Sequence, residues 1–169
     1  MDIDLTCNDR MSYPMLLKQN TNSYYAGLLQ NLFCGDDSEV CSFLSFRYYI
    51  YCLSPFYESV VTVLQKIAQQ ELKHQEILAN AIIMLGKNPV YYDAQCKWFS
   101  TRSIDYIKNL KDVLSFSREK KEKAIIDYKL AMSKISNFEI KNLLERILID
   151  EEKHLEWILK LYGEFFSAN

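Results

Sequence analysis

The chain has 169 residues, a formal net charge of −2, 49% hydrophobic residues, and only 4 glycines and 3 prolines. This length fits one domain with a substantial core, and the scarcity of turn-forming residues favours long helices. Lysines and arginines are scattered among acidic residues, so no basic stripe indicates a nucleic-acid-binding protein. No apolar run approaches the roughly 18 residues of a membrane span, and the acidic start, MDIDLTCNDR, is unlike a signal peptide. We therefore expect a cytoplasmic protein.

The cysteines are odd in number and form no CxxC pair. They are Cys7, Cys34, Cys41, Cys52 and Cys96. This pattern favours reduced thiols, and it argues against a zinc ribbon or a rubredoxin-type iron centre.

The chain divides into an N-terminal extension, residues 1–21, and one domain, residues 22–169. Apolar residues at helical spacing predict four long helices in this domain, at residues 22–53, 55–85, 103–135 and 137–166. We expect helix on both sides of Gly35, with a kink there.

Boundary signals support these helices. Ser54 and Pro55 form an N-cap with proline at the first helical position. Ser136 and Glu139 form a capping box, and Gly86 ends the second helix.

The connections predict the topology. The first and second helices are joined by a couple of residues, as are the third and fourth, which predicts two antiparallel hairpins. Between the hairpins, residues 86–103 are rich in aromatic residues and predict a crossover packed along the bundle. The prediction is therefore an all-α, antiparallel four-helix bundle with one long crossover, which is the arrangement of ferritin-like folds.

The second and fourth predicted helices carry the same apolar pattern, 80 residues apart. Its members are Val60, Leu64, Ile67, Leu78, Ala81 and Leu85 in the second helix, and Ile140, Leu144, Ile147, Ile158, Leu161 and Phe165 in the fourth. The pairing indicates an internal repeat.

Both patterns are interrupted in the same way, by Glu71 and His74 in one helix and by Glu151 and His154 in the other. These are the 2 histidines of the chain. A carboxylate in an apolar row is costly unless a cation meets it, and Glu and His three residues apart share a helix face. Carboxylates with neutral imidazoles favour iron or manganese. The alternative is two Glu–His pairs on the surface of amphipathic helices.

Glu39 interrupts a row of the first helix in the same manner. The other members, spaced by seven, are Tyr25, Leu32, Phe46 and Leu53. The chain between Glu39 and Glu71 is long enough to reach the helix end and return to the same level. The alternative is that Glu39 caps a helix that begins near Asp36, which the repeat disfavours.

These residues resemble the ferritin-like superfamily, in the group of rubrerythrin, bacterioferritin and the manganese-catalase-like proteins. The segments that carry the resemblance are GDDSEVCSFLSF, IAQQELKHQEIL, NLKDVL with EKAIIDY, and LLERILIDEEKHLEW. With the crossover they cover nearly everything from Tyr24 to Leu161.

The resemblance implies a site with two metals, iron or manganese, that reacts with peroxide or dioxygen. Glu71 and Glu151 would bridge the metals, and Glu39 with His74 would complete one of them. A glutamate of the third helix with His154 would complete the other. The CxxC pairs of the rubrerythrin iron–sulfur module are missing, so if the protein is a peroxidase, its electrons would have to come from another protein.

The third helix departs from this pattern. Its row spaced by seven is Ile107, Leu114, Lys121, Tyr128 and Ile135. The residue that faces the site is therefore Lys121. The resemblance agrees, because the ligand glutamate of the family precedes the AIxxY segment by three residues, as Lys121 precedes Ala124 here.

Charge then favours fewer metals. Four carboxylates balance two divalent ions, whereas Glu39, Glu71 and Glu151 with the Lys121 ammonium balance one. We predict that Lys121 stands in for the second metal and leaves one ion, or an unequal pair, near Glu39 and His74.

Two alternatives remain open. A local π-bulge could turn Glu122 inward as a sixth ligand, or Lys121 could extend out of the bundle and leave a metal-free scaffold. Tyr128 is a candidate hydrogen-bond donor to a ligand carboxylate, or a core tyrosine.

The sequence thus supports two functions. The first is an oxidoreductase that binds one or two iron or manganese ions and handles hydrogen peroxide or dioxygen in oxidative stress. The second is a non-catalytic structural or stress-associated relative with a degenerate site. We expect a homo-oligomer (dimer), with Tyr48, Tyr49 and Tyr51 packed against the crossover or a second subunit.

Overall fold

The structure is a computed structural model that describes residues 12–17 and 19–166. Apart from one isolated β-bridge between Tyr92 and Trp98, the regular structure in these residues is helical. Its elements are α1 (Ser23–Cys34), α2 (Glu39–Leu53), α3 (Glu58–Met84), the 3-10 helix η1 (Thr101–Ser103), α4 (Leu110–Ser133) and α5 (Phe138–Phe166). The all-α prediction is confirmed.

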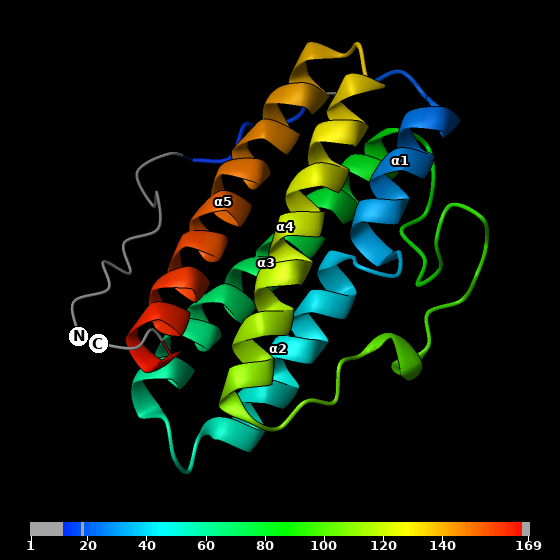
Figure 1. Cartoon of the computed structure of the whole chain (residues 1–169). Coiled ribbons are helices and arrows are strands. Elements are labelled where there is room, and N and C mark those ends of the chain that lie inside the picture. The colour runs from blue at the N-terminus through cyan, green and yellow to red at the C-terminus, as the bar shows by residue number, and fades with distance from the viewer. Residues whose placement is uncertain (1–11, 18, 167–169) are drawn as a thin grey trace.

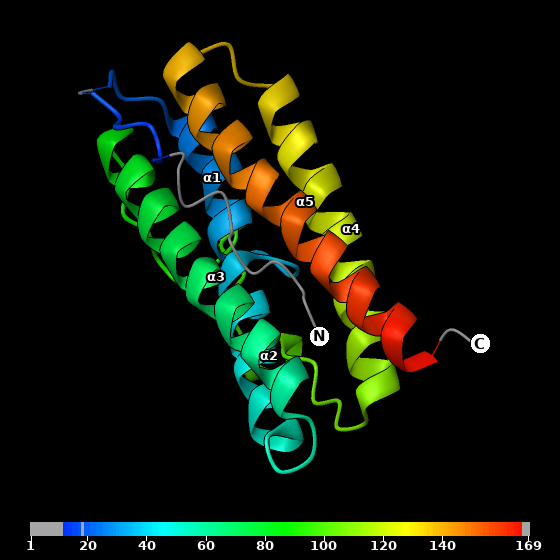
Figure 2. The same ribbon diagram turned by 90° about the vertical axis from the view of Figure 1, so that its left-hand side faces the viewer.

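The helices form a bundle of two hairpins (Figure 1). Helices α1 and α2 follow one another along one edge and pair with α3, whereas α4 pairs with α5. Figure 2 shows the same two pairs side by side from another direction. The segment between α3 and α4 runs along the length of the bundle past α1 and α2, so the predicted crossover is confirmed (Figure 1).

The core consists of two apolar clusters, one toward each end of the bundle. One cluster joins α1 to the second half of α3 and the first half of α5. The other joins α2 to the first half of α3 and the second half of α5. A layer of buried polar residues lies between them, at the level where α2 begins. Burial of the two clusters fixes the helices on both sides of this layer.

The first predicted helix is two helices. Gly35 ends α1, and its N–H donates to Asn31 O at 2.8 Å. A Cβ at this position would lie 2.6 Å from the same oxygen, so a larger residue would have to displace backbone. Ser38 then caps α2, because its side chain accepts from the Cys41 N–H. Helix does lie on both sides of Gly35, but residues 35–38 form a break between two helices.

Three other boundaries differ from the predictions. Ser54 closes α2 by donating its N–H to Ile50 O, and α3 starts at Glu58, so the predicted start at Ser54 and Pro55 is wrong.

Helix α4 starts at Leu110 and not at residue 103, because Asn109 caps it by accepting from the Asp112 N–H. Helix α5 is capped by Asn137, whose side chain accepts from the Ile140 N–H, and not by Ser136. Ser136 instead lies within hydrogen-bonding distance of the Tyr25 hydroxyl, at 2.7 Å. Gly86 ends α3 as predicted, with a φ of +86°.

Other parts of the chain pack against the bundle. Tyr48 contacts Tyr106 of the crossover with ring centroids 5.0 Å apart, and Tyr49 is buried, whereas Tyr51 is exposed. Cys34, Cys41, Cys52 and Cys96 are free thiols, and Cys7 lies outside the described residues. No helix in the described part of the chain has both the length and the apolar content needed to cross a membrane.

Candidate metal centre

Six ionisable side chains form the polar layer at the centre of the bundle. They come from all four long elements of the bundle: Glu39 of α2, Glu71 and His74 of α3, Lys121 of α4, and Glu151 and His154 of α5. Each is at most 3% exposed. Charges this deeply buried must be compensated by other charges or by an ion.

Lys121 lies inside this layer. Its Nζ donates to Glu71 Oε1 at 2.8 Å and to Glu151 Oε2 at 2.7 Å. The side chain is 2% exposed, so it does not extend out of the bundle. The ammonium therefore joins the two carboxylates that the resemblance implies as bridges between metals.

The electrostatics of these three groups are coupled. Burial by itself would lower the pKa of Lys121, but Glu151 and Glu71 raise it above its ordinary value. Burial and Glu151 would raise the pKa of Glu71, but Lys121 and His154 lower it to about 2. Burial opposes ionisation of Glu151 as well, yet Lys121 and His154 hold its pKa well below the usual range. The carboxylates are ionised because the ammonium lies between them.

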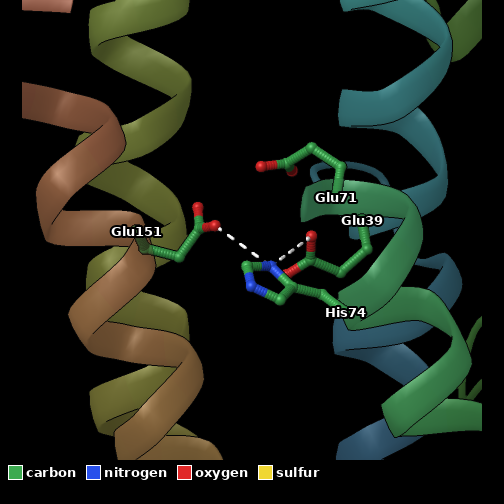
Figure 3. Close-up of side chains that lie close together, drawn as sticks. All are labelled: Glu39, Glu71, His74 and Glu151. Atoms are coloured by element: carbon green, nitrogen blue, oxygen red, sulfur yellow. Dashed lines mark ion pairs between the residues drawn. The ribbon is translucent and has the colours of Figure 1, made fainter. Parts of the chain in front are cut away.

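Glu39 and His74 lie with Glu71 on the side of the layer that faces Glu151 (Figure 3). His74 Nδ1 lies 3.4 Å from Glu39 Oε2 and 3.4 Å from Glu151 Oε1. Burial and the charge of Glu71 raise the pKa of Glu39 to about 7, and the Tyr128 hydroxyl donates to Glu39 Oε1. Tyr128 is thus a hydrogen-bond donor within the layer.

Four of these residues are arranged so that one ion could be held between them. Glu39, Glu71, His74 and Glu151 each offer a ligand atom, and these atoms lie within 4.8 Å of one another. In Figure 3, Glu151 of α5 faces the other three across the centre of the bundle. One atom of each residue also makes no hydrogen bond of good geometry, although His74 Nδ1 lies within ion-pair distance of Glu39 and Glu151. These atoms are Glu39 Oε2, Glu71 Oε2, His74 Nδ1 and Glu151 Oε1. Buried polar atoms without partners are uncommon and are typical of a site that binds something.

His154 occupies the Lys121 side of the layer. Its Nδ1 lies 3.1 Å from Glu71 Oε1 and 3.2 Å from Glu151 Oε1, and its Nε2 lies 2.7 Å from Gln70 Oε1. Among the described residues, His154 is not part of the group that could hold one ion. The imidazole implied for the second metal is in place, but the neighbouring position holds an ammonium.

Glu122 lies outside the layer. Its side chain is 52% exposed and lies 3.7 Å from Arg118. Helix α4 is α-helical from Leu110 to Ser133, without a π-bulge. The structure therefore contradicts the alternative in which Glu122 turns inward as a sixth ligand, because an uninterrupted helix directs consecutive residues to different faces.

Sequence reasoning missed Asp150, which orients His74. Asp150 Oδ2 lies 3.3 Å from His74 Nε2 and accepts from the Tyr13 hydroxyl at 2.6 Å, and Asp150 Oδ1 lies 2.6 Å from Arg146. Burial would raise the pKa of Asp150, but His74, Arg146 and Tyr13 lower it to about 2. A carboxylate on the outer nitrogen of an imidazole fixes which nitrogen faces the metal side.

Two features of the sequence indicate this network. Arg146 and Asp150 are four residues apart, and Asp150 immediately precedes Glu151. Tyr13 carried no such signal, because it lies in the extension and reaches Asp150 only through the fold.

The chain resembles known proteins in sequence and in structure. The sequence model of the rubrerythrin family matches residues 38–162. A manganese catalase from Anabaena, KatB, superposes with a TM-score of 0.80 at 18% identity, over 91% of this chain and 78% of that chain. The bacterioferritin of Desulfovibrio desulfuricans, with its diiron site, superposes with a TM-score of 0.72 at 16% identity, over 86% of this chain and 83% of that chain.

A third structure is the bacterioferritin of Rhodobacter capsulatus, whose dinuclear site is metal-free. It superposes with a TM-score of 0.72 at 14% identity, over 86% of this chain and 89% of that chain. A comparison with curated proteins found no match. At these identities the structural likeness concerns the ferritin-like fold, whereas the family match covers most of the sequence. The chain belongs to the rubrerythrin family.

Proposed function

We propose that this chain binds one divalent ion, iron or manganese, between Glu39, Glu71, His74 and Glu151, and that the Lys121 ammonium takes the place of a second ion. The observation that carries the proposal is the pair of hydrogen bonds from Lys121 Nζ to Glu71 Oε1 and Glu151 Oε2, at 2.8 and 2.7 Å.

Glu71 and Glu151 each have one oxygen that accepts from Lys121 and one oxygen that the proposed ion could bind. Glu71 Oε1 and Glu151 Oε2 accept from Lys121, whereas Glu71 Oε2 and Glu151 Oε1 have no hydrogen-bond partner. The latter two oxygens belong to residues of the group that could hold one ion. A single ion on that side would therefore use atoms that Lys121 leaves free.

Charge supports the same number of ions. Three carboxylates and one ammonium leave two negative charges in the layer, which one divalent ion neutralises. A second divalent ion would leave a surplus of two positive charges in a buried layer, which is costly. The donor set of carboxylates with one imidazole suits iron or manganese better than a thiolate-preferring metal.

We further propose hydrogen peroxide or dioxygen as the substrate, with an external protein as electron donor. A bound iron or manganese ion supplies redox chemistry toward such small molecules, and one structural neighbour is a manganese catalase. Around the ion, Tyr128 holds Glu39, while Asp150 orients His74.

A non-catalytic structural or stress-associated role is the second candidate. The observation that favours it is that Lys121 already neutralises part of the charge on Glu71 and Glu151, so the layer is partly compensated without any ion.

Metal content separates these functions. The purified protein is equilibrated with Fe²⁺ under anaerobic conditions, or with Mn²⁺, freed of loose ions and measured by elemental analysis. We expect one ion per chain in wild type and in Glu122→Gln, the control whose side chain is exposed. Two tightly held ions would overturn the replacement by Lys121, and none would overturn metal binding. Peroxide consumption that requires both the ion and an added electron donor would support the enzyme over the scaffold.

A further inference from the structure

A cavity links the polar layer to the surface at the break between α1 and α2. It has a volume of about 320 Å³, and its wall includes Glu39, Glu71 and Glu151 at the inner end and Asp36 and Asp37 at the outer end. Figure 1 shows this break beside α4, with the crossover running past it. The inner carboxylates are buried, so the cavity is an opening through which an ion can approach them from this side.

The break is built into the sequence. Gly35 ends α1 where a Cβ would collide with Asn31 O, and Ser38, which directly follows Asp36 and Asp37, caps the start of α2. A continuous helix would close this side of the bundle with the side chains of a full turn. The break places Asp36 and Asp37 there instead, with one residue between Asp37 and Glu39.

Asp37 is held at the outer end by two lysines of α4. Lys120 and Lys123 both donate to its carboxylate, and Lys120 also lies 3.5 Å from Asp105 of the crossover. The Asp37 side chain is only 13% exposed, whereas that of Lys123 is 55% exposed. Lys123 can therefore swing into solvent while the aspartate stays at the wall, whereas Lys120, with 31% of its side chain exposed, can turn from Asp37 toward Asp105.

The charge along the cavity favours a cation. The outer wall carries five aspartates, Asp36, Asp37, Asp93, Asp105 and Asp127, against three lysines, Lys120, Lys123 and Lys134. Lys97, which pairs with Asp36, adds a fourth positive charge nearby. The inner layer has two more carboxylates than ammonium groups, so it also attracts a cation when its imidazoles are neutral.

The inner end also contains atoms that an arriving cation would satisfy. Glu39 and Glu71 are buried and line the cavity, and Glu39 Oε2 and Glu71 Oε2 have no hydrogen-bond partner. These atoms distinguish the cavity from a cluster of surface acids.

We propose that this cavity is the route by which a divalent cation reaches the polar layer, and that Asp37 is the first carboxylate to hold it. The cation displaces the Lys123 and Lys120 ammonium groups from Asp37 and then passes to Glu39. The inference rests on the proposed metal binding, but it concerns the rate and path of loading and not the final site.

The chain offers an internal probe of loading. Trp157 is buried with its ring centroid 5.8 Å from that of His154, and the other of the 2 tryptophans, Trp98, is exposed on the crossover. In a Trp98→Phe background, the fluorescence of Trp157 reports an ion at the layer. Chelator-treated protein is mixed rapidly with Co²⁺ or Mn²⁺, and the quenching rate and the equilibrium Kd are both measured.

Asp37→Asn should load about tenfold more slowly than the background protein, because a local charge that concentrates a ligand raises its association rate by at least this factor. Its Kd should change less than twofold, since Asp37 is not a final ligand. Lys123→Met should load faster, because it removes a competitor for Asp37. Glu76→Gln and Lys73→Met are the matched controls, since they change the same charges in an exposed pair on α3 and should load at the background rate.

Three results would overturn the inference. Loading of Asp37→Asn at the background rate would exclude this route, and so would equal slowing by Glu76→Gln. In either case an unchanged Kd for the ion would leave the proposed function intact. Background protein that binds no ion after prolonged equilibration would overturn the proposed function, and the route with it. Because Lys123→Met acts in the opposite direction to Asp37→Asn, misfolding of one variant cannot imitate both results.

Discussion

Replacing Lys121 tests the charge argument most directly. Lys121→Met removes the ammonium from two buried carboxylates, and breaking a buried ion pair in this way costs about 3–5 kcal/mol. In a chain of this size, 1 kcal/mol changes Tm by about 2–4 °C. We therefore expect metal-free Lys121→Met to unfold roughly 10 °C below metal-free wild type.

Lys121→Glu goes further, because it places a fourth carboxylate in the layer. Without metal it should be at least as unstable as Lys121→Met, because like charges then face one another. The four carboxylates of this variant's layer are balanced by two divalent ions. At a free metal concentration of about 100 times Kd, each bound ion adds about 2.7 kcal/mol to the free energy of unfolding. We therefore expect two ions per chain in this variant and one in wild type, with the larger rise in Tm on metal addition in the variant.

The assay is calorimetry with and without Mn²⁺ or Fe²⁺, combined with elemental analysis. Lys111→Glu is the matched control, since Lys111 lies on the same helix with an exposed side chain. The reasoning is refuted if metal-free Lys121→Met is as stable as wild type, or if Lys121→Glu still binds a single ion.

Three other predictions follow from individual contacts. The pKa of Glu39, raised to about 7 from an ordinary 4.5, means that the metal-free fold loses stability as pH rises from 4.5 through 7. At pH 8 the free energy of unfolding of metal-free Glu39→Gln, measured with urea, should therefore exceed that of metal-free wild type by about 3 kcal/mol. Equal urea midpoints for the two proteins would show that Glu39 is not a buried ionised group at this pH. Asp150→Asn should weaken metal binding about 10- to 100-fold in calorimetric titration, because it loosens the orientation of His74; an unchanged Kd would remove that positioning role. Gly35→Ala should lower stability by about 1–3 kcal/mol, because the new Cβ meets Asn31 O; a neutral effect would show that the break relaxes freely.

Much of the fold could be predicted because each hairpin carries its own periodic signal. The rows spaced by seven place Leu114, Lys121 and Tyr128 on one face of α4, and all three are buried. The paired Glu and His positions followed from the same periodicity. Tertiary contacts were not required for these predictions, since a helix fixes which residues share a face.

The remaining features depend on competition between local signals and on contacts across the fold. Ser54 carries the signal of a helix start, but its N–H completes the last turn of α2 instead. Helix α4 begins late because Asp105 first binds the Ser45 side chain of α2 through its N–H, which keeps that part of the crossover on the hairpin. Asp150 begins a run of charged residues that ends at Lys153, so its sequence context does not set it apart, and only the packing of α5 against α3 places it on His74.

Position 121 determines what the paired Glu-x-x-His motifs can do. His154 still contacts Glu71 and Glu151, so both motifs are intact in sequence and in geometry. The Lys121 ammonium compensates the carboxylate charge as a metal ion would, but it cannot change oxidation state. Reduction of hydrogen peroxide to two waters takes two electrons and two protons, and a bound ion that returns to its starting oxidation state supplies neither electron, so a donor outside the chain would have to provide both in every turnover. Dependence on a donor, and not peroxide consumption alone, therefore distinguishes a one-ion enzyme from a scaffold that binds an ion without using it.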